Sequence, residues 1–309
     1  MPKFDVVIGN PPYNGKKTKG NGGSMSGNAI WQKFVENAYK ILHSGGYLCY
    51  VHPIDWRIGP VGKKKKVAQD ILLSNQILYA KLFVTPFDDV SQVVDWYIME
   101  KKSKYKNTIV KFANNVKLEM DISKEPLPNY GGEKINSIIN KVFKTENNGF
   151  IGANTWWFDP DKGENKTYKY AHGVNFTKNE YKYYDTPHND QFKKKVIMCD
   201  TRPIRAMYDK GNIGIAGHIH YILVDNKKQA NFFINIVNSN LIQFLSKLYS
   251  FDVIRKDGKT ARWQNAYPLT KILIDDVNLQ SDEDIYDYFN LSKEEINLIK
   301  NDNFYNDKY

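Results

Sequence analysis

The chain has 309 residues, of which 41% are hydrophobic and 25% are charged, so it can bury a sizeable core and form two domains. Its formal net charge of +10 favours a polyanionic partner, with nucleic acid as the leading class. The sequence has no run of about 18 apolar residues and no signal-peptide pattern, which excludes a membrane-spanning protein and predicts a cytoplasmic one. Cys49 and Cys199 lie too far apart for a CxxC site or a disulfide framework.

The first predicted element is a strand from Phe4 to Ile8, an apolar run that ends at Gly9. Such a run is typical of a strand that is buried on both faces of a parallel sheet. Residues 14–28 are rich in glycine and lysine and predict a surface loop. This loop holds one of several basic clusters, each of which is either a solvated surface or a contact to a phosphate backbone. The clusters are Lys16, Lys17 and Lys19, residues 63–66, residues 101–106 and residues 193–195.

A helix is predicted from Ala29 onward because apolar residues recur at helical spacing, and the glycines of "HSGG" are expected to end it. The next strand, Tyr47 to Val51, stops at "HPIDW". Strand, helix and strand in this order predict a parallel pair, and ligands bind at the carboxyl ends of such strands. The motif "NPPY" that follows Gly9 and the motif "HPIDW" are therefore expected at one ligand-binding edge.

The later elements are a helix over residues 65–74 and two antiparallel strands, Ile77 to Val84 and Val93 to Met99, that are expected to close the sheet. One apolar helix is predicted over Asn231 to Leu248, and Ser292 with Glu295 has the spacing of a capping box. The shift toward polar residues near residue 101 predicts three regions: 1–104, 105–280 and a helical tail, 281–309.

Asn10, Pro11, Pro12 and Tyr13 form the motif that carries chemistry. Each proline fixes its own φ, and Pro11 also restricts Asn10, so the backbone is stiff. The side-chain oxygen of Asn10 and the carbonyl of Pro11 can accept the two hydrogens of an exocyclic amine, while the Tyr13 ring stacks on the base that bears it. The alternative interpretation is a proline-rich turn between two elements.

At these residues the chain resembles a known family. "FDVVIGNPPY", "GGYLCYVHPIDW" and "VTPFDDVSQVVDWYIMEKK" resemble the catalytic half of gamma-class N6-adenine DNA methyltransferases of restriction–modification systems. Residues 195–224 and 231–274 are more loosely similar to the C-terminal target-recognition domain of that family. The resemblance implies an α/β fold, in which the C-terminal half of a Rossmann-like methyltransferase sheet precedes a mixed α+β target-recognition domain.

The resemblance implies that the chain transfers a methyl group from S-adenosylmethionine to a flipped-out adenine in double-stranded DNA. Asn10, Pro11 and Pro12 then belong to the catalytic motif, and Tyr13 and Phe87 stack on the target base. Phe87 alone is equally well explained as a core residue of a hairpin turn. Candidates for DNA contacts are Arg202, Arg205, Arg255, Lys256, Lys259 and Arg262.

One departure concerns the cofactor site. The family binds S-adenosylmethionine with an FxGxG turn upstream of the NPPY strand, and no such turn precedes that strand in this sequence. Neither Gly211 to Gly217 nor "GNGGSMSG" replaces it, so only the edge near Asn10 and Pro12 is expected to contribute to this site. The chain alone is therefore expected to be inactive, until an N-terminal segment or a second polypeptide completes the sheet. Without those strands, Phe4 to Ile8 would be an exposed apolar edge.

Two other functions stay open. The missing cofactor motif favours a DNA-binding specificity module without catalysis. A protein-glutamine or RNA methyltransferase is a further alternative, because NPPY clamps also bind a glutamine amide or a guanine amine, but the long basic region disfavours it. No metal site is predicted, since His218 and His220 lack further ligands at matching spacing. A fused or partner endonuclease is also compatible with the sequence.

Overall fold

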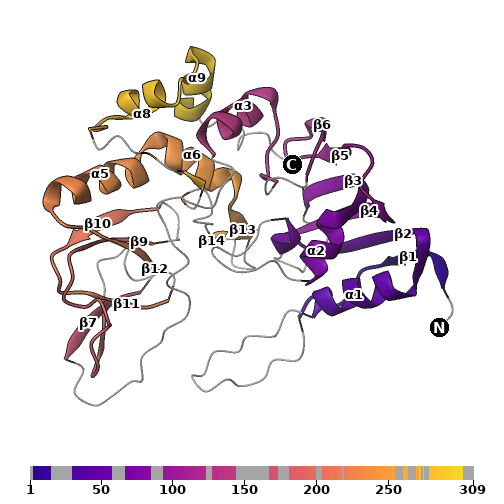
Figure 1. The fold of residues 1–309 in the computed structure, drawn as a ribbon, viewed down its shortest axis with the longest axis horizontal. Helices are drawn as coiled ribbons and strands as arrows, with labels where there is room; N and C mark the ends of the chain where they lie inside the picture. Colours follow the sequence, from indigo (N-terminus) through magenta and orange to yellow (C-terminus); the bar gives the residue numbers. More distant parts are fainter. Residues whose placement is uncertain are drawn as a thin grey trace.

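The computed structural model of the chain is a mixed α/β protein (Figure 1). It describes residues 3–14, 30–57, 67–84, 93–122, 127–143, 167–172, 181–199, 204–217, 219–254, 260–263, 269, 271–272, 274 and 278–301. No helix among these residues has both the length and the apolar character needed to cross a bilayer. In Figure 1 the N-terminal sheet lies at one side of the molecule, and α5, α6, α8 and α9 lie at the other.

The N-terminal elements alternate between strands and short helices. They are β1 (Phe4–Gly9), α1 (Trp31–Ile41), β2 (Leu42–Pro53), the 3-10 turn η1 (Ile54–Trp56), α2 (Val67–Ser74), β3 (Asn75–Val84), β4 (Val94–Ser103), β5 (Thr108–Lys111) and β6 (Lys117–Met120). The strands form one six-stranded sheet in the order β1-β2-β4-β3-β5-β6. The β1–β2 and β3–β5 pairs are parallel, whereas β2–β4, β3–β4 and β5–β6 are antiparallel.

Strand β1 is at one edge of this sheet, and its burial differs from the first expectation. Phe4 and Val6 are each 47% exposed and Ile8 is 77% exposed, so the prediction that this strand is buried on both faces is wrong. The parallel pairing with β2 is confirmed. The described part of the chain supplies a neighbour for β1 on one side alone, and so its apolar side chains face solvent, as expected for an uncovered edge.

Helices α1 and α2 pack against each other and against β2 and β3 (Figure 1). Helix α1 buries Trp31, Val35 and Ala38, which are spaced by four and three residues and so share one helix face. These side chains belong to one apolar core with Leu48 of β2 and Tyr97 of β4. Burial of each large apolar side chain stabilises the fold by roughly 1.5–3 kcal/mol.

Two details of the predicted sheet need correction. Helix α1 ends at Ile41 with Leu42 in an extended conformation, so "HSGG" lies within β2 and does not terminate the helix. The antiparallel pair β3–β4 does not close the sheet, because β5 pairs with the other side of β3. The division of the chain at residue 104 stays a prediction, but the sheet itself continues past it to Met120.

The C-terminal elements are α3 (Glu133–Val142), β7 (Tyr168–Ala171), β8 (Tyr181–Tyr184), β9 (Lys195–Cys199), β10 (Ala206–Asp209), β11 (Gly214–Ile215), β12 (Ile219–Leu223), α5 (Lys227–Asn238), α6 (Asn240–Leu248), β13 (Phe251–Ile254), β14 (Thr260–Trp263), α8 (Asp282–Tyr288) and α9 (Lys293–Asn301). They form two three-stranded sheets, β10-β9-β12 and β11-β7-β8, and the hairpin β13–β14. Apolar side chains of α3, α5, α6, α8, α9 and β9 form a second core.

The predicted single helix over Asn231 to Leu248 is in fact two helices, α5 and α6. Ser239 separates them with an extended backbone, φ −61° and ψ 152°, and its hydroxyl caps α6 by accepting a hydrogen bond from the backbone N–H of Ile242. The predicted capping box of α9 is confirmed. The N–H of Glu295 donates to the Ser292 hydroxyl at 3.3 Å, and the N–H of Ser292 donates to the Glu295 carboxylate at 2.6 Å.

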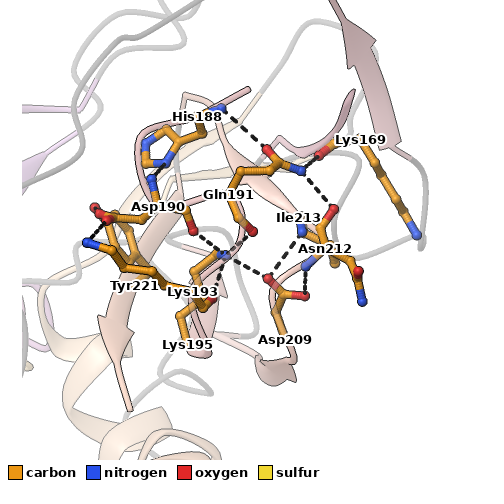
Figure 2. Close-up of polar contacts among 10 residues, drawn as sticks. All are labelled: Lys169, His188, Asp190, Gln191, Lys193, Lys195, Asp209, Asn212, Ile213 and Tyr221. Atoms are coloured by element: carbon orange, nitrogen blue, oxygen red, sulfur yellow. Dashed lines mark hydrogen bonds and ion pairs between the residues drawn. The ribbon is translucent and has the colours of Figure 1, made fainter. Parts of the chain in front are cut away.

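A buried lysine holds the turn before β9 in place (Figure 2). Lys195 is 0% exposed, and its ammonium forms an ion pair of 2.7 Å with Asp209. The same ammonium donates to the backbone carbonyls of Asp190, Gln191 and Lys193. These carbonyls and the Asp209 carboxylate satisfy the charge without solvent, so this network has a structural role.

Candidate active site at the carboxyl end of β1

Asn10 follows the last residue of β1 and is exposed. Because β1 and β2 run parallel, with Gly9 opposite Tyr50, the carboxyl ends of the two strands meet at the same edge of the sheet. "NPPY" and the start of "HPIDW" therefore lie at neighbouring strand ends, as the sequence predicts. Pro11 is buried and Pro12 exposed, so the motif leaves the sheet with one proline anchored in the protein.

Gly9 lets the strand pass close to an aromatic ring. A Cβ atom at Gly9 would lie 3.2 Å from Cε1 of Tyr50, which is closer than ordinary van der Waals contact. Tyr50 is itself largely buried, so the ring has little room to move away. The glycine before Asn10 therefore sets how closely this strand end packs on β2.

Tyr13 contacts Asn10 directly. Its hydroxyl donates a hydrogen bond of 2.7 Å to Oδ1 of Asn10. Burial raises the pKa of Tyr13, so the phenol stays protonated and remains a donor at neutral pH. An amide oxygen has two lone pairs, so Oδ1 of Asn10 keeps capacity to accept a second hydrogen bond. The contact thus orients the amide with its oxygen toward Tyr13.

The start of α1, with its N-cap residue Ile30, also binds the Asn10–Tyr13 motif. The backbone N–H groups of Ile30 and Trp31 reach the carbonyl of Tyr13 at 3.0 Å and 3.5 Å. The free N–H groups at a helix start are suitable donors for such a carbonyl. Tyr13 is therefore fixed at its carbonyl by α1 and at its hydroxyl by Asn10.

His52, at the carboxyl end of β2, supports this helix start. Its ring is fully buried and stacks on Trp31 with ring centroids 4.2 Å apart and an interplanar angle of 16°. Nδ1 lies 3.0 Å from the carbonyl of Pro53, which can only accept, so Nδ1 carries the hydrogen and Nε2 accepts from the Tyr97 hydroxyl at 3.0 Å. Burial lowers the pKa of His52 to about 4, and the ring is therefore neutral at physiological pH.

This arrangement presents a hydrogen-bond acceptor and an aromatic ring on a rigid turn. Asn10 is exposed and Tyr13 is half-buried, which leaves both within reach of a ligand at the strand end. Such a pair can bind an amine on a planar ring, by accepting its hydrogens and stacking on the ring. Among the described residues, no group of three or more histidine, cysteine, aspartate or glutamate side chains could hold a metal ion.

Most other predicted site residues fall outside the described part of the chain. This applies to Phe87, Lys16, Lys17, Lys19, Arg202, Arg255, Lys256 and Lys259, and to His218. Arg205 is exposed just before β10, where its carbonyl accepts from the N–H of Cys199 at 3.2 Å. Arg262 is on β14 opposite Asp252 of β13. The structure thus brings Asn10 and Tyr13 into contact, whereas Arg205 precedes β10 and Arg262 lies on β14.

Sequence reasoning missed the groups behind the motif. His52 and Trp31 are far apart in the sequence, and no local sequence pattern predicts that their rings stack. Arg57 and Asp95 form a fully buried ion pair of 2.6 Å, 38 residues apart in sequence. A signal for this pair was present in "VVDWYIM", where Asp95 interrupts a strand pattern of buried residues and so requires a buried partner.

The comparison with protein families concerns this same region. Residues 1–84 match the model of the family described as Eco57I restriction-modification methylase. The match contains the whole Asn10–Tyr13 motif and the elements β1 to β3. No curated protein matches the chain.

Similar solved structures come from restriction-modification enzymes. The M protein of the type I restriction enzyme EcoKI is 15% identical with a TM-score of 0.27, and the match covers 36% of this chain and 25% of that protein. The type IIL restriction-modification enzyme MmeI, solved in complex with DNA, is 11% identical with a TM-score of 0.43, and the match covers 86% of this chain and 45% of that one. The type IIG restriction endonuclease BpuSI is 9% identical with a TM-score of 0.28, with 86% and 44% covered. The chain spans less than half the length of each of these proteins.

Proposed function

We propose that this chain is the catalytic and target-binding portion of a DNA adenine-N6 methyltransferase of a restriction–modification system. The observation that carries the proposal is the exposed Asn10 at the carboxyl end of β1, within the 84 residues that match a restriction-modification methylase family. The stiff Asn-Pro-Pro-Tyr turn and the position of its tyrosine support the same assignment.

In this proposal Oδ1 of Asn10 and the carbonyl of Pro11 accept the two N6 hydrogens of a flipped-out adenine, and Tyr13 stacks on the base. The amine lone pair is then directed away from the protein. When bound, S-adenosylmethionine would supply an electrophilic methyl group to N6, and the sulfur would keep the electron pair of the broken C–S bond. The proton lost from N6 passes to water. No strong base is required, because the two acceptors draw electron density from the N–H bonds toward the amine nitrogen.

The cofactor site is proposed to be shared with strands that pair on β1. The sequence contains no FxGxG turn that follows a buried strand, and β1 offers an apolar edge on which such a strand would be buried. We propose that an N-terminal segment or a second polypeptide supplies this strand, so that the sheet seen here is the C-terminal half of a methyltransferase sheet.

Double-stranded DNA is the proposed substrate. The net charge of +10 supports binding to a phosphate backbone, and Arg205 is an exposed cation in the C-terminal part. Arg262 and the other predicted basic residues remain candidates for base or phosphate contacts.

A second candidate is a DNA-binding specificity module without catalysis. The absence of an FxGxG turn from the printed sequence favours it. This candidate predicts that exchange of Asn10 leaves every activity of the chain unchanged.

The test is the exchange Asn10→Ala in the chain expressed with its native neighbouring genes, in a host without DNA methyltransferases of its own. Single-molecule sequencing should find N6-methyladenine at one sequence motif with the wild type and none with the variant. The rate of methyl transfer should fall by more than about a hundredfold, because the variant loses one of the two groups that accept the N6 hydrogens.

Fluorescence anisotropy with an oligonucleotide that carries the mapped motif is the accompanying control. The purified wild type and Asn10→Ala should bind it with affinities within about threefold, since Asn10 contributes no charge. If methylation survives the exchange, the assignment of Asn10 is wrong.

A further inference from the structure

The buried ion pair between Arg57 and Asp95 is the centre of a hydrogen-bond network that joins several segments of the chain. Asp95 of β4 is 0% exposed and accepts hydrogen bonds from Nε1 of Trp56 at 2.8 Å and from Nε of Arg57 at 2.6 Å. Both donors belong to the segment that directly follows β2, and therefore lie close along the chain to His52. Asp95 thus ties the strand end beside the candidate active site to the centre of the sheet.

Asp95 also holds the end of β3. Its Oδ1 accepts from the backbone N–H of Phe83 at 2.7 Å, and Phe83 has a φ of 55°. This left-handed conformation is unfavourable for a bulky residue, and the hydrogen bond from its N–H to Asp95 helps to offset the cost. One carboxylate therefore fixes the chain where β2 ends and where β3 ends.

Arg57 extends the network out of the sheet. Its side chain is 1% exposed; Nη1 donates to the carbonyl of Leu127 at 2.6 Å and Nη2 donates to Oδ1 of Asn129 at 2.8 Å. Leu127 belongs to the sheet core, whereas Tyr130 belongs to the core of the C-terminal helices. The guanidinium of Arg57 therefore binds Leu127 and Asn129, where the chain leaves the sheet core and enters the core of the C-terminal helices.

Asn129 carries the connection to the C-terminal part. Its backbone N–H donates to the carbonyl of Leu248 at 2.7 Å, and its Nδ2 donates to the carbonyl of Ser250 at 2.6 Å. Leu248 ends α6, and Ser250 directly precedes β13. The hairpin β13–β14 contains Arg262, and the sequence between its strands includes the predicted DNA contacts Arg255, Lys256 and Lys259. The bonds of Asn129 therefore connect the sheet to the start of this hairpin.

We propose that Asp95, Arg57 and Asn129 are positioning residues that set the separation between the Asn10–Tyr13 motif and the β13–β14 hairpin, and thereby select which adenine of a bound site reaches the motif. The part that concerns DNA rests on the proposed function. Each of the three side chains is almost fully buried and hydrogen-bonded to at least two elements or segments. Water therefore cannot replace a hydrogen bond that one of them loses.

The conformational test needs no activity. Spin labels at Asn37 on α1 and Lys228 on α5, both exposed, report the distance between the two parts by double electron–electron resonance, once Cys49 and Cys199 are replaced by serine. Arg57→Lys keeps the charge but loses the planar fork, and Asn129→Ala removes the bond to Ser250. Both variants should broaden or shift the distance distribution.

Lys195→Met is the matched control, because Lys195 is an equally buried ion-pair lysine whose partners all lie within residues 190–209. It should lower the thermal stability while leaving the distance distribution narrow and unshifted. An unchanged distribution in both Arg57→Lys and Asn129→Ala would overturn the inference. If Arg57→Lys fails to fold, the milder Asn129→Ser is measured in its place.

The second arm uses the methylation-competent enzyme. Asn129→Ala should lower kcat at the mapped adenine by about a hundredfold with little change in KM for DNA, and should raise the share of methyl groups on neighbouring adenines. Lys195→Met should leave that share unchanged. An unaltered distribution of methyl groups over adenines in Asn129→Ala would overturn the DNA part. If the wild type methylates no DNA, the proposed function fails, and the distance measurement alone decides the conformational part.

Discussion

The two edges of the six-stranded sheet differ in length and in side-chain chemistry. Strand β6 has four residues, and its two exposed side chains, Lys117 and Glu119, are charged. Strand β1 has six residues and exposes Phe4, Val6 and Ile8. Short, charged strands are how natural sheets prevent unwanted pairing, whereas a longer apolar edge invites it. The comparison favours β6 as an end of the sheet and supports the proposal that another strand pairs with β1.

The largest expected effect comes from a charge on the open edge. Ile8→Lys should leave the free energy of unfolding within about 0.5 kcal/mol of the wild type, because the side chain packs against little. It should weaken association through β1 by at least about a hundredfold, since an unpaired lysine is costly to bury beside a new strand. Sedimentation velocity of the chain co-expressed with its native neighbours measures this association, and equal complex formation by the wild type and Ile8→Lys would show that β1 is not the interface.

The reverse change should make the protected edge behave like the open one. The double exchange Lys117→Val and Glu119→Ile removes both exposed charges of β6 and should create concentration-dependent association that the wild type lacks at this edge. This association through β6 should persist when the double exchange is combined with Ile8→Lys. A monomeric triple variant would mean that the charges on β6 have no protective role.

Acidification should loosen the β1 side of the sheet first. The folded pKa of His52 is about 4, below its usual value of 6.5. Between these values the unfolded chain binds a proton that the folded chain does not, so stability is fully present above pH 6.5 and falls by up to about 3 kcal/mol as the pH drops to 4. His52→Phe should flatten this dependence.

Hydrogen exchange followed by mass spectrometry locates that effect. Helix α1, whose Trp31 stacks on His52, should lose protection between pH 6.5 and 4 before β6 does, after correction for the intrinsic pH dependence of exchange. Equal loss at both edges would contradict the role given to His52.

The smallest effect is expected at Tyr13. Tyr13→Phe keeps the ring and removes the hydrogen bond to Asn10, which stabilises the turn by about 0.5–1.5 kcal/mol. Methyl transfer should fall by less than about tenfold, because the acceptor oxygen and the stacking surface both remain. In the companion variant Tyr13→Ala, the rate of methyl transfer should fall further. Equal rates for the two variants would argue against stacking.

The sequence alone was sufficient to predict the two strands beside the motif and their parallel pairing, whereas the roles assigned to Asn10 and Tyr13 stay predictions. The apolar run that Gly9 ends, the helical spacing after Ala29 and the strand from Tyr47 together predict the parallel pair β1–β2, and the pair was found. The exposure of β1 depends on which strands lie beside it, and so the apolar pattern alone led to the wrong burial.

Other features depend on long-range contacts that no local pattern contains. The bonds from Arg57 to Asp95 and Asn129 connect residues 38 and 72 positions apart in the chain. The break between α5 and α6 occurs at Ser239, where a cap competes with helix continuation, although the apolar spacing runs through. The bond between Tyr13 and Asn10 follows from side-chain conformations, which the motif does not specify.

The most direct test of the account is to identify the molecule that receives the methyl group. Tritiated S-adenosylmethionine is added to the chain co-expressed with its native neighbours, together with DNA, RNA and protein, and each fraction is hydrolysed and separated. The account predicts label in N6-methyldeoxyadenosine from the wild type and its loss in both Asn10→Ala and Ile8→Lys. Label in methylglutamine or in RNA nucleosides, or in deoxyadenosine from Asn10→Ala at the wild-type level, would contradict it.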